Sequence, residues 1–270
     1  RQVRSLGCKL FYFTGGEPFV WPGFPEVCRR ILDDPQAHVV ILTNGMALHA
    51  GQDDVLTLDR DRTHFQVSLD GTQQTNDAIR GQDAFRRIEA GVRFLRSNGF
   101  PVTLAMAVGR TNVSQMQELV ATALAWDVKN VHYLWFFHKG KGQNQESVPA
   151  QEIVPQLLNA YGRANQTGVL IDNVEILKSQ VFSLPGTRFD LSNAGWQAMA
   201  IGPDGAIYPS PALIGDLRMR AGHIDDGVEA VWANSAVLRK VRHASIAKDS
   251  VYSQNPLKFL VGGGDIDHSF

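Results

Sequence analysis

The sequence contains little cysteine: Cys8 and Cys28 are the two thiols in a chain of 270 residues. Two separate cysteines without a Cys-x-x-Cys spacing exclude a disulfide-rich scaffold and argue against a metal site built from this pair alone. Free cysteine packs as a small apolar side chain, so we expect both thiols to be buried and unreactive.

Long apolar runs and an excess of one charge are also missing. No stretch approaches the roughly 20 apolar residues of a membrane helix, and the start shows no signal-peptide pattern. The 26 basic and 27 acidic residues leave a net charge of −1. Long-range attraction to nucleic acid or to an anionic membrane is therefore not expected. We predict a cytoplasmic protein without either partner.

Both ends of the sequence resemble cuts rather than natural domain ends. The chain begins with Arg1 instead of methionine, and it stops at Phe270 directly after a glycine-rich turn. A polar tail, which commonly frays from a domain, is present at neither end. We therefore expect a fragment of a longer protein.

The first part of the sequence alternates short β-branched or aromatic runs with amphipathic stretches. This alternation predicts repeated βα units and a parallel sheet. Five strands are too few for a closed eight-stranded barrel, so we predict an open or partial barrel, or one whose first unit lies upstream of Arg1. The expected strands are 9–13, 38–42, 63–69, 102–108 and 131–137, and the expected helices are 24–32, 84–97, 114–125 and 149–165.

The pattern changes after about residue 181. Residues 182–193 have no clear period and contain proline and glycine, which predicts a linker. Two short apolar runs flank the turn Gly202–Gly205, a strong hairpin signal. A helix is expected over 229–241. These elements predict a small α+β appendage behind the barrel.

A glycine-rich motif, Thr14-Gly15-Gly16-Glu17-Pro18, follows the first expected strand. The two glycines let a backbone approach a ligand closely, and Glu17 offers a carboxylate to a cationic group such as an amine. Loops at the carboxyl ends of parallel strands are where α/β proteins bind ligands. Taken alone, the motif is explained equally well as a glycine turn with a surface glutamate.

A second motif, Ser68-Leu69-Asp70-Gly71, follows the third expected strand, with Arg80 ten residues beyond the aspartate. A hydroxyl and a carboxylate at a strand end suit ribose hydroxyls, and Arg80 suits a carboxylate. Taken alone, a solvated turn with a helix cap explains this segment better.

Together and in this order, these motifs resemble the radical S-adenosylmethionine (SAM) superfamily. The resemblance runs from about Leu6 to Gly142. It implies an α/β fold, a partial (β/α)6 TIM-like barrel over residues 1–180 from which the first βα unit is missing. Further matching positions are the Thr43–Gly45 turn, the helix positions Phe85, Gly91, Val92 and Leu95, and the turn at Asn112.

The resemblance also implies where SAM binds. In this superfamily the Gly-Gly-Glu loop holds the methionine amine, a role that would belong to Gly15, Gly16 and Glu17. The other implied roles are contact with the ribose or carboxylate for Ser68 and Arg80, shaping of the site for Asn44, and proximity to the adenine for Leu134.

The superfamily's chemistry requires a 4Fe–4S cluster held by three cysteine thiolates, usually spaced Cys-x3-Cys-x2-Cys. The cluster binds SAM and cleaves it reductively to a 5′-deoxyadenosyl radical. The resemblance implies that the ligand loop lies upstream of Arg1, and neither Cys8 nor Cys28 has the spacing to replace it. We expect the intact protein to use SAM and this cluster, and the fragment alone to bind no cluster and to be inactive.

Residues 181–270 resemble a SPASM domain, an appendage found in enzymes that mature ribosomal peptides. The resemblance rests on Ile201–Pro209, Ala221–Ile224, Val231-Trp232 and the ending from Pro256 to Gly264. It implies a peptide or protein substrate and an electron donor such as a flavodoxin or ferredoxin. SPASM domains normally carry auxiliary clusters, but poor iron ligands stand at or near the cysteine positions: Asn193, Ser210, Ser253, Asn255 and Val261.

Two other functions stay open from the sequence. A catalytically inactive relative that binds peptides would also lack these cysteines, and a conventional barrel enzyme for a phosphorylated metabolite would need an anion site at the late strands. The remaining polar and aromatic positions have plainer explanations: a packed barrel strand for Trp135–Phe137, strand-end or loop positions for His132 and His138, a strand exit for Gly140–Gly142, and a solvated loop for Asp265, Asp267 and His268.

Overall fold

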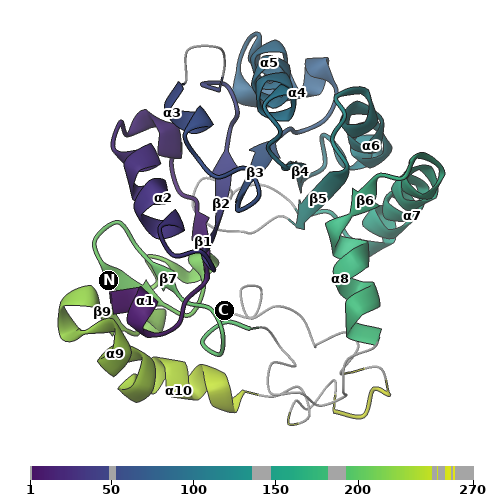
Figure 1. Cartoon of the computed structure of the whole chain (residues 1–270). Helices are drawn as coiled ribbons and strands as arrows, with labels where there is room; N and C mark the ends of the chain where they lie inside the picture. Colours follow the sequence, from purple (N-terminus) through teal and green to yellow (C-terminus); the bar gives the residue numbers. More distant parts are fainter. Residues whose placement is uncertain are drawn as a thin grey trace. The chain divides into compact units, whose positions relative to one another are not determined.

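The structure is a computed structural model that describes residues 2–48, 53–135, 147–181, 193–244, 248, 253–256 and 258. The chain divides into two compact units. The larger is Lys9–Ile176, and the smaller joins Arg1–Cys8 to Leu177–Phe270 (Figure 1). The boundary expected after residue 180 lies close to this division, but the sequence did not indicate that the first residues belong with the second unit.

The larger unit contains one sheet of six parallel strands, each hydrogen-bonded to the next in chain order. This confirms the predicted α/β sheet and adds a sixth strand, which is too short to produce a period in the sequence. The strands are β1 (Leu10–Phe13), β2 (His38–Thr43), β3 (Thr63–Ser68), β4 (Val102–Val108), β5 (Asn130–Trp135) and β6 (Leu170–Ile171).

Helices cover the outer face of this curved sheet (Figure 1). Helices α2 and α5 have the bounds that the apolar spacing predicts, whereas α4, a polar helix directly after the second motif, was not predicted. The helical elements are η1 (Pro18–Val20), α2 (Phe24–Leu32), α3 (Asp53–Leu56), α4 (Gln73–Arg80), α5 (Ala84–Ser97), η2 (Val113–Gln115), α6 (Met116–Ala125), α7 (Ala150–Thr167) and α8 (Asp172–Val181), which crosses the unit boundary.

The two faces of the sheet differ in polarity. On β2 and β3 buried and partly exposed residues alternate, as expected for strands whose side chains point to opposite faces in turn. Ile41, Phe65 and Val67 are fully buried beneath the helices. The intervening residues, such as His64 and Gln66, line the inner face and are partly exposed. The inner face is thus available to ligands.

The smaller unit contains a three-stranded antiparallel sheet, with β8 between β7 and β9. The predicted hairpin is confirmed, and Gly205 takes φ +82° in its turn. Helix α1 joins this unit, because Gln2 Oε1 accepts a hydrogen bond from Val228 N. The strands are β7 (Ala200–Ile201), β8 (Ala206–Tyr208) and β9 (Gly222–His223), and the helical elements are α1 (Gln2–Ser5), η4 (Pro211–Leu213), η5 (Leu217–Met219), η6 (Ile224–Asp226), α9 (Val228–Asn234) and α10 (Ala236–His243).

The prediction of one helix over 229–241 is wrong, because two helices occupy this stretch. Ser235 takes an extended conformation, with φ −60° and ψ 128°, and so ends α9. Its hydroxyl oxygen accepts a hydrogen bond from Leu238 N at 3.5 Å and caps α10. A serine between two apolar stretches is compatible with one continuous helix, so the periodicity did not reveal the break.

Several sequence predictions lie outside the described residues. They concern the linker over 182–192 and Phe136, Phe137, His138, Gly140–Gly142, Val261, Asp265, Asp267 and His268. Among the helices that the structure does describe, none combines the length and the apolar composition of a membrane span.

Candidate functional site

The Gly-Gly-Glu motif leaves the carboxyl end of β1 as an exposed loop. Gly15 has φ +121°, a conformation that favours glycine. A Cβ atom added to Gly15 or Gly16 would meet no atom of the described chain within 4 Å. The loop therefore presents bare backbone to open space, as a ligand-holding loop requires.

The carboxylate of Glu17 is turned back towards the protein and joins this loop to the end of β2. Its Oε1 accepts hydrogen bonds from Thr43 Oγ1 at 2.8 Å and from Phe19 N at 3.3 Å. Its Oε2 accepts one from Asn44 N at 2.7 Å. These three bonds fill most of the roughly four acceptor positions of a carboxylate. The group is fixed in orientation, and Oε2 keeps capacity for one further donor.

The turn after β2 is itself tightly held. Thr43 Oγ1 accepts a hydrogen bond from Gly45 N at 3.0 Å, and Asn44 Oδ1 accepts one from Met46 N at 2.8 Å. Helix α5 packs directly on this turn: a Cβ on Gly91 would lie 2.2 Å from Gly45 O. Glycine at position 91 therefore lets α5 approach the turn that orients Glu17.

The second motif forms an internal ion pair. Arg80, the last residue of α4, donates to Asp70 Oδ2 from Nε at 2.8 Å and from Nη2 at 2.7 Å. Asp70 is 4% exposed. The sequence suggested that Arg80 binds the carboxylate of a ligand, but in the structure its main partner is the motif's own aspartate. Within the described residues, Nη1 has no hydrogen-bond partner.

Asp70 also connects β3 to the end of β4. Its Oδ1 accepts a hydrogen bond from Ala107 N at 3.1 Å. Asn112 Nδ2 donates to Asp70 O at 3.2 Å and to Ala107 O at 2.9 Å. Asn76 Oδ1 accepts from Asp70 N at 3.1 Å. Sequence reasoning did not assign these positioning roles, although Asp70 and Asn112 belong to the motifs it singled out.

The other two predicted positions lie on the inner face of the same sheet. Ser68, the last residue of β3, is half-buried, and its hydroxyl has no hydrogen-bond partner among the described residues. Leu134 on β5 is 36% exposed and pairs in register with Ala107. Both are open to a ligand that lies across the sheet.

Six of the seven predicted positions thus lie at or just beyond the carboxyl half of neighbouring parallel strands, and Arg80, at the end of α4, reaches this region through Asp70. The structure directly joins Glu17 to the Asn44 turn, whereas Arg80 belongs to the separate network around Asp70. Among the described residues no hydrogen bond links the two networks. Their joint role in binding one ligand stays a prediction.

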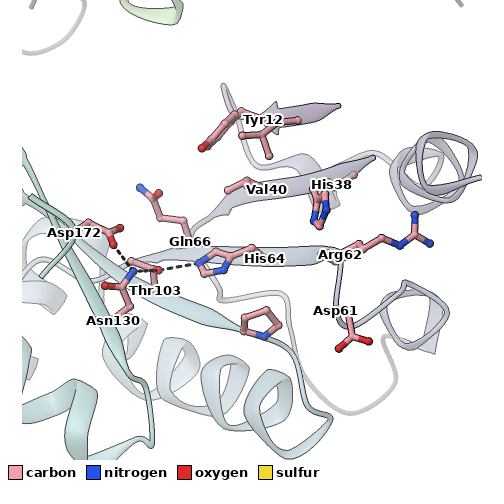
Figure 2. Close-up of a pocket in the computed structure, with 14 residues that line it drawn as sticks. Tyr12, His38, Val40, Asp61, Arg62, His64, Gln66, Thr103, Asn130 and Asp172 are labelled. Carbon is pink, nitrogen blue, oxygen red and sulfur yellow. Dashed lines mark hydrogen bonds between the residues drawn. The ribbon is translucent and has the colours of Figure 1, made fainter. Parts of the chain in front are cut away.

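The described part of the larger unit has a cavity at a different place, on the inner face towards the amino ends of the strands. Its volume is about 380 Å³. Figure 2 shows polar side chains of several strands projecting from this face. Sequence analysis missed it, because its residues are widely separated along the chain. The lining residues are Leu10, Tyr12, His38, Val39, Val40, Asp61, Arg62, Thr63, His64, Gln66, Pro101, Thr103, Asn130 and Asp172.

Comparison with known proteins agrees with the motif order. A sequence model of the Radical SAM superfamily matches residues 1–123. Over 253 residues the chain is 30% identical to the mycofactocin maturase MftC of Mycobacterium ulcerans. This match covers 88% of this chain and 66% of MftC. Over 263 residues it is 24% identical to the AdoMet-dependent heme synthase of Methanosarcina barkeri, covering 89% of this chain and 73% of that protein.

Solved structures share the fold. The crystal structure of Streptococcus suis SuiB bound to precursor peptide SuiA superimposes with a TM-score of 0.77 at 14% identity, covering 99% of this chain and 63% of that chain. At this identity the likeness concerns the fold alone, and it agrees with the predicted partial barrel. The chain spans roughly two thirds of the length of these relatives.

Proposed function

We propose that this chain, which belongs to the radical SAM superfamily, forms the SAM-binding part of an enzyme that modifies a peptide or protein. The observation that carries this proposal is the Glu17 carboxylate. It is fixed by Thr43 and Asn44 beside a loop with open space over Gly15 and Gly16. A fixed carboxylate next to bare backbone suits the ammonium group of an amino acid.

In this proposal, the residues at the carboxyl ends of the parallel strands contact SAM as follows. The backbone of Gly15 and Gly16 lies against the methionine part, and Glu17 Oε2 accepts a hydrogen bond from its ammonium group. Nη1 of Arg80 and the Ser68 hydroxyl supply donors for the carboxylate or ribose. The remaining two assignments are shaping of the site by Asn44 and an apolar contact with the adenine by Leu134.

The residues of this chain do not fit a 4Fe–4S cluster. Cys28 is 0% exposed, and burial raises its pKa to about 12, so it is a protonated thiol at neutral pH. Cys8 is half-buried, with a pKa also raised by burial, and belongs to the other unit. Within the described residues no three His, Cys, Asp or Glu side chains form a group that could hold a metal ion. No step of the reaction is assigned to a cluster on these residues.

A peptide or protein is the substrate class that the relatives favour. MftC is named a maturase, and SuiB is described with a bound precursor peptide. These relatives favour an enzyme over the inactive peptide-binding relative considered from the sequence. As part of this proposal, a flavodoxin or ferredoxin supplies the electron that radical SAM chemistry consumes.

The smaller unit is proposed to act as a SPASM-like appendage that holds substrate without auxiliary clusters. Two of the positions expected near cysteines lie within the described part of this unit. The carbonyl oxygen of Asn193 accepts hydrogen bonds from the amides of Trp196 and Gln197 at 3.0 Å and 2.9 Å. Ser210 is 5% exposed and precedes η4.

Titration calorimetry of the chain with SAM tests the proposal, with wild type compared to Glu17→Gln. The amide can still donate to Thr43 Oγ1 and accept from Asn44 N, although it no longer accepts from Phe19 N, so two of the three contacts remain while the negative charge is lost. We expect SAM affinity to fall about tenfold, the value of one charge-assisted hydrogen bond.

Glu152→Gln, an exposed change on α7, is the matched control and should bind SAM as wild type does. Thermal unfolding of both variants checks that each is folded. Equal SAM affinity in wild type and Glu17→Gln would remove the assignment of this loop.

A further inference from the structure

The cavity near the amino ends of the strands contains a carboxylate that the proposed SAM site does not use. Asp172 begins α8, and its Oδ1 accepts a hydrogen bond from Asn130 Nδ2 at 2.6 Å. Its Oδ2 lies 3.6 Å from His132 Nδ1. The side chain is 35% exposed and is part of the cavity lining.

Polar contacts behind Asp172 fix its position. Asn130 Nδ2 also donates to Thr103 Oγ1 at 2.9 Å, and His64 Nε2 lies 2.8 Å from the same hydroxyl (Figure 2). This chain of contacts runs across β3, β4 and β5 to the start of α8. Asp172 is therefore held in place by Asn130, flanked by His132, and still partly exposed in the cavity lining.

Two further polar side chains share this inner face. Tyr12 on β1 is 59% exposed, and Gln66 on β3 has an amide without a hydrogen-bond partner among the described residues. Burial, and then the charge of Asp172, raise the pKa of the Tyr12 hydroxyl. Figure 2 shows Tyr12 and Gln66 projecting on the same side of the sheet as Asp172. They supply an aromatic face and hydrogen-bond acceptors around the carboxylate.

The guanidinium of Arg62, which lines the cavity, is already paired with protein groups. Arg62 Nη2 contacts Asp59 Oδ2 at 2.7 Å, and Arg62 Nη1 donates to the carbonyl oxygens of Leu32 and Asp34 at 2.8 Å and 2.9 Å. Burial lowers the pKa of His64, so its imidazole is neutral at pH 7. Asp61 adds an exposed carboxylate to the lining. The cavity therefore carries an excess of negative charge and of acceptors.

We infer that this cavity is a second binding site, separate from the SAM loop, and that it takes a lysine or arginine side chain of the peptide substrate. Asp172 accepts the hydrogen bonds of the cation, Gln66 adds an amide oxygen, and Tyr12 offers its ring face. A volume of about 380 Å³ lies within the range of small-ligand sites and accommodates one long side chain. The assignment to a peptide rests on the proposed function, whereas the preference for a cation rests on the cavity alone.

The test uses the full chain and three probes: acetyl-Gly-Lys-Gly-amide, the same peptide with glutamine, and the same peptide with glutamate. Binding is followed by NMR through the side-chain amide signals of Gln66 and Asn130. We expect the lysine peptide to bind about tenfold tighter than the glutamine peptide, and the glutamate peptide to bind more weakly than either.

Asp172→Asn should abolish the preference for lysine, since the amide keeps a hydrogen bond to Asn130 but loses the charge. Asp83→Asn is the matched control, because Asp83 is exposed, lies outside the cavity and has φ 59°, which asparagine tolerates. It should retain the wild-type preference. Gln66→Leu removes an unpartnered amide and should weaken lysine binding about threefold, which keeps the inference testable should Asp172→Asn fail to fold.

Equal binding of the lysine and glutamine peptides to wild type, or an unchanged lysine preference in folded Asp172→Asn, would overturn the inference. SAM titration of the same samples separates this result from the proposed function. Asp172→Asn should bind SAM as wild type does. A wild-type chain that binds the lysine peptide but not SAM would contradict the proposed function and leave the cavity assignment standing.

Discussion

Two carboxylates on one sheet are held in different ways. Glu17, at the carboxyl end of β1, receives three hydrogen bonds from the protein and lies beside open backbone. Asp172, next to the amino end of β5, accepts one short hydrogen bond from Asn130, has His132 beside its other oxygen, and lines a cavity. The first is fixed in orientation by three hydrogen bonds, whereas the second has one short hydrogen bond and a longer contact with His132.

The difference indicates two kinds of recognition. A carboxylate that the protein has already oriented suits a ligand bound in one fixed geometry, as a reacting cofactor must be. A carboxylate with unpartnered polar and aromatic neighbours suits a flexible cationic side chain that selects its own geometry. We therefore expect ligand binding at the carboxyl ends of the strands to be sensitive to changes in packing. Ligand binding in the cavity should respond mainly to changes in charge.

The largest effect on stability is expected from Gly91→Ala, which disturbs the turn that orients Glu17. The added Cβ would lie 2.2 Å from Gly45 O and 2.9 Å from Leu48 O, both backbone atoms. Relief requires α5 or the turn to move, and we expect a loss of about 3 kcal/mol in the free energy of unfolding. Urea denaturation measures this loss.

Gly162→Ala is the matched control for that substitution. Gly162 also lies within a helix, but a Cβ there meets no described atom within 4 Å. Alanine should therefore stabilise the protein by about 0.5–1 kcal/mol. If both variants were stabilised, close packing of α5 on the Glu17 turn would be excluded as the reason for glycine at position 91.

Arg80→Gln should have the next largest effect. It leaves the Asp70 carboxylate, which is 4% exposed, without its cationic partner. Loss of a fully buried partner costs about 3–5 kcal/mol, and because Arg80 is itself partly exposed we expect about 2 kcal/mol. Chemical denaturation at pH 7 checks the value. A change below about 0.5 kcal/mol would mean that the pair contributes little and that Arg80 is available to a ligand carboxylate.

The smallest effect on stability at neutral pH is expected for Cys28, which, unlike the two carboxylates, is fully buried. Burial raises its pKa from 9.0 to about 12, so the folded state holds the thiol proton more tightly than the unfolded chain. Its contribution to stability is complete below pH 9 and is lost as the pH rises towards 12. The loss is at most about 1.4 kcal/mol per pH unit.

Urea unfolding of wild type and Cys28→Ala at pH 8 and pH 10.5 measures this dependence. The wild type should lose more stability than the variant between these values. Native protein at pH 8 should also show slow labelling of Cys28 by a thiol reagent, with Cys8 reacting first because it is half-buried. Rapid labelling of both thiols in the folded state would contradict the assigned burial.

The two ends of the sheet also differ in how far the sequence predicts them. Gly15, Gly16, Glu17 and Asn44 follow strands in short glycine-containing turns, so their grouping at one end could be expected from the strand order. The pairing of Arg80 with Asp70 could not, because it depends on α4, a polar helix without a clear apolar period. The unpredicted strand β6 is two residues long, too short for any pattern.

The cavity was beyond sequence analysis for a different reason. Tyr12, His64, Thr103, Asn130 and Asp172 come from different strands and one helix start, and they meet through strand register. A register shift of one residue would turn each strand residue to the other face. Each of these residues is ordinary at its own place in the sequence. The cluster forms only when the chain folds, so no sequence motif indicates it.

The most direct test of the central claim is to map SAM on the chain by two-dimensional ¹H–¹⁵N NMR. We expect SAM to shift the backbone amide signals of Gly15, Gly16 and Asn44 and to leave the side-chain amide signal of Asn130 unchanged. Shifts at Asn130 without shifts at Gly15 and Gly16 would place SAM in the cavity and contradict the separation of the two sites.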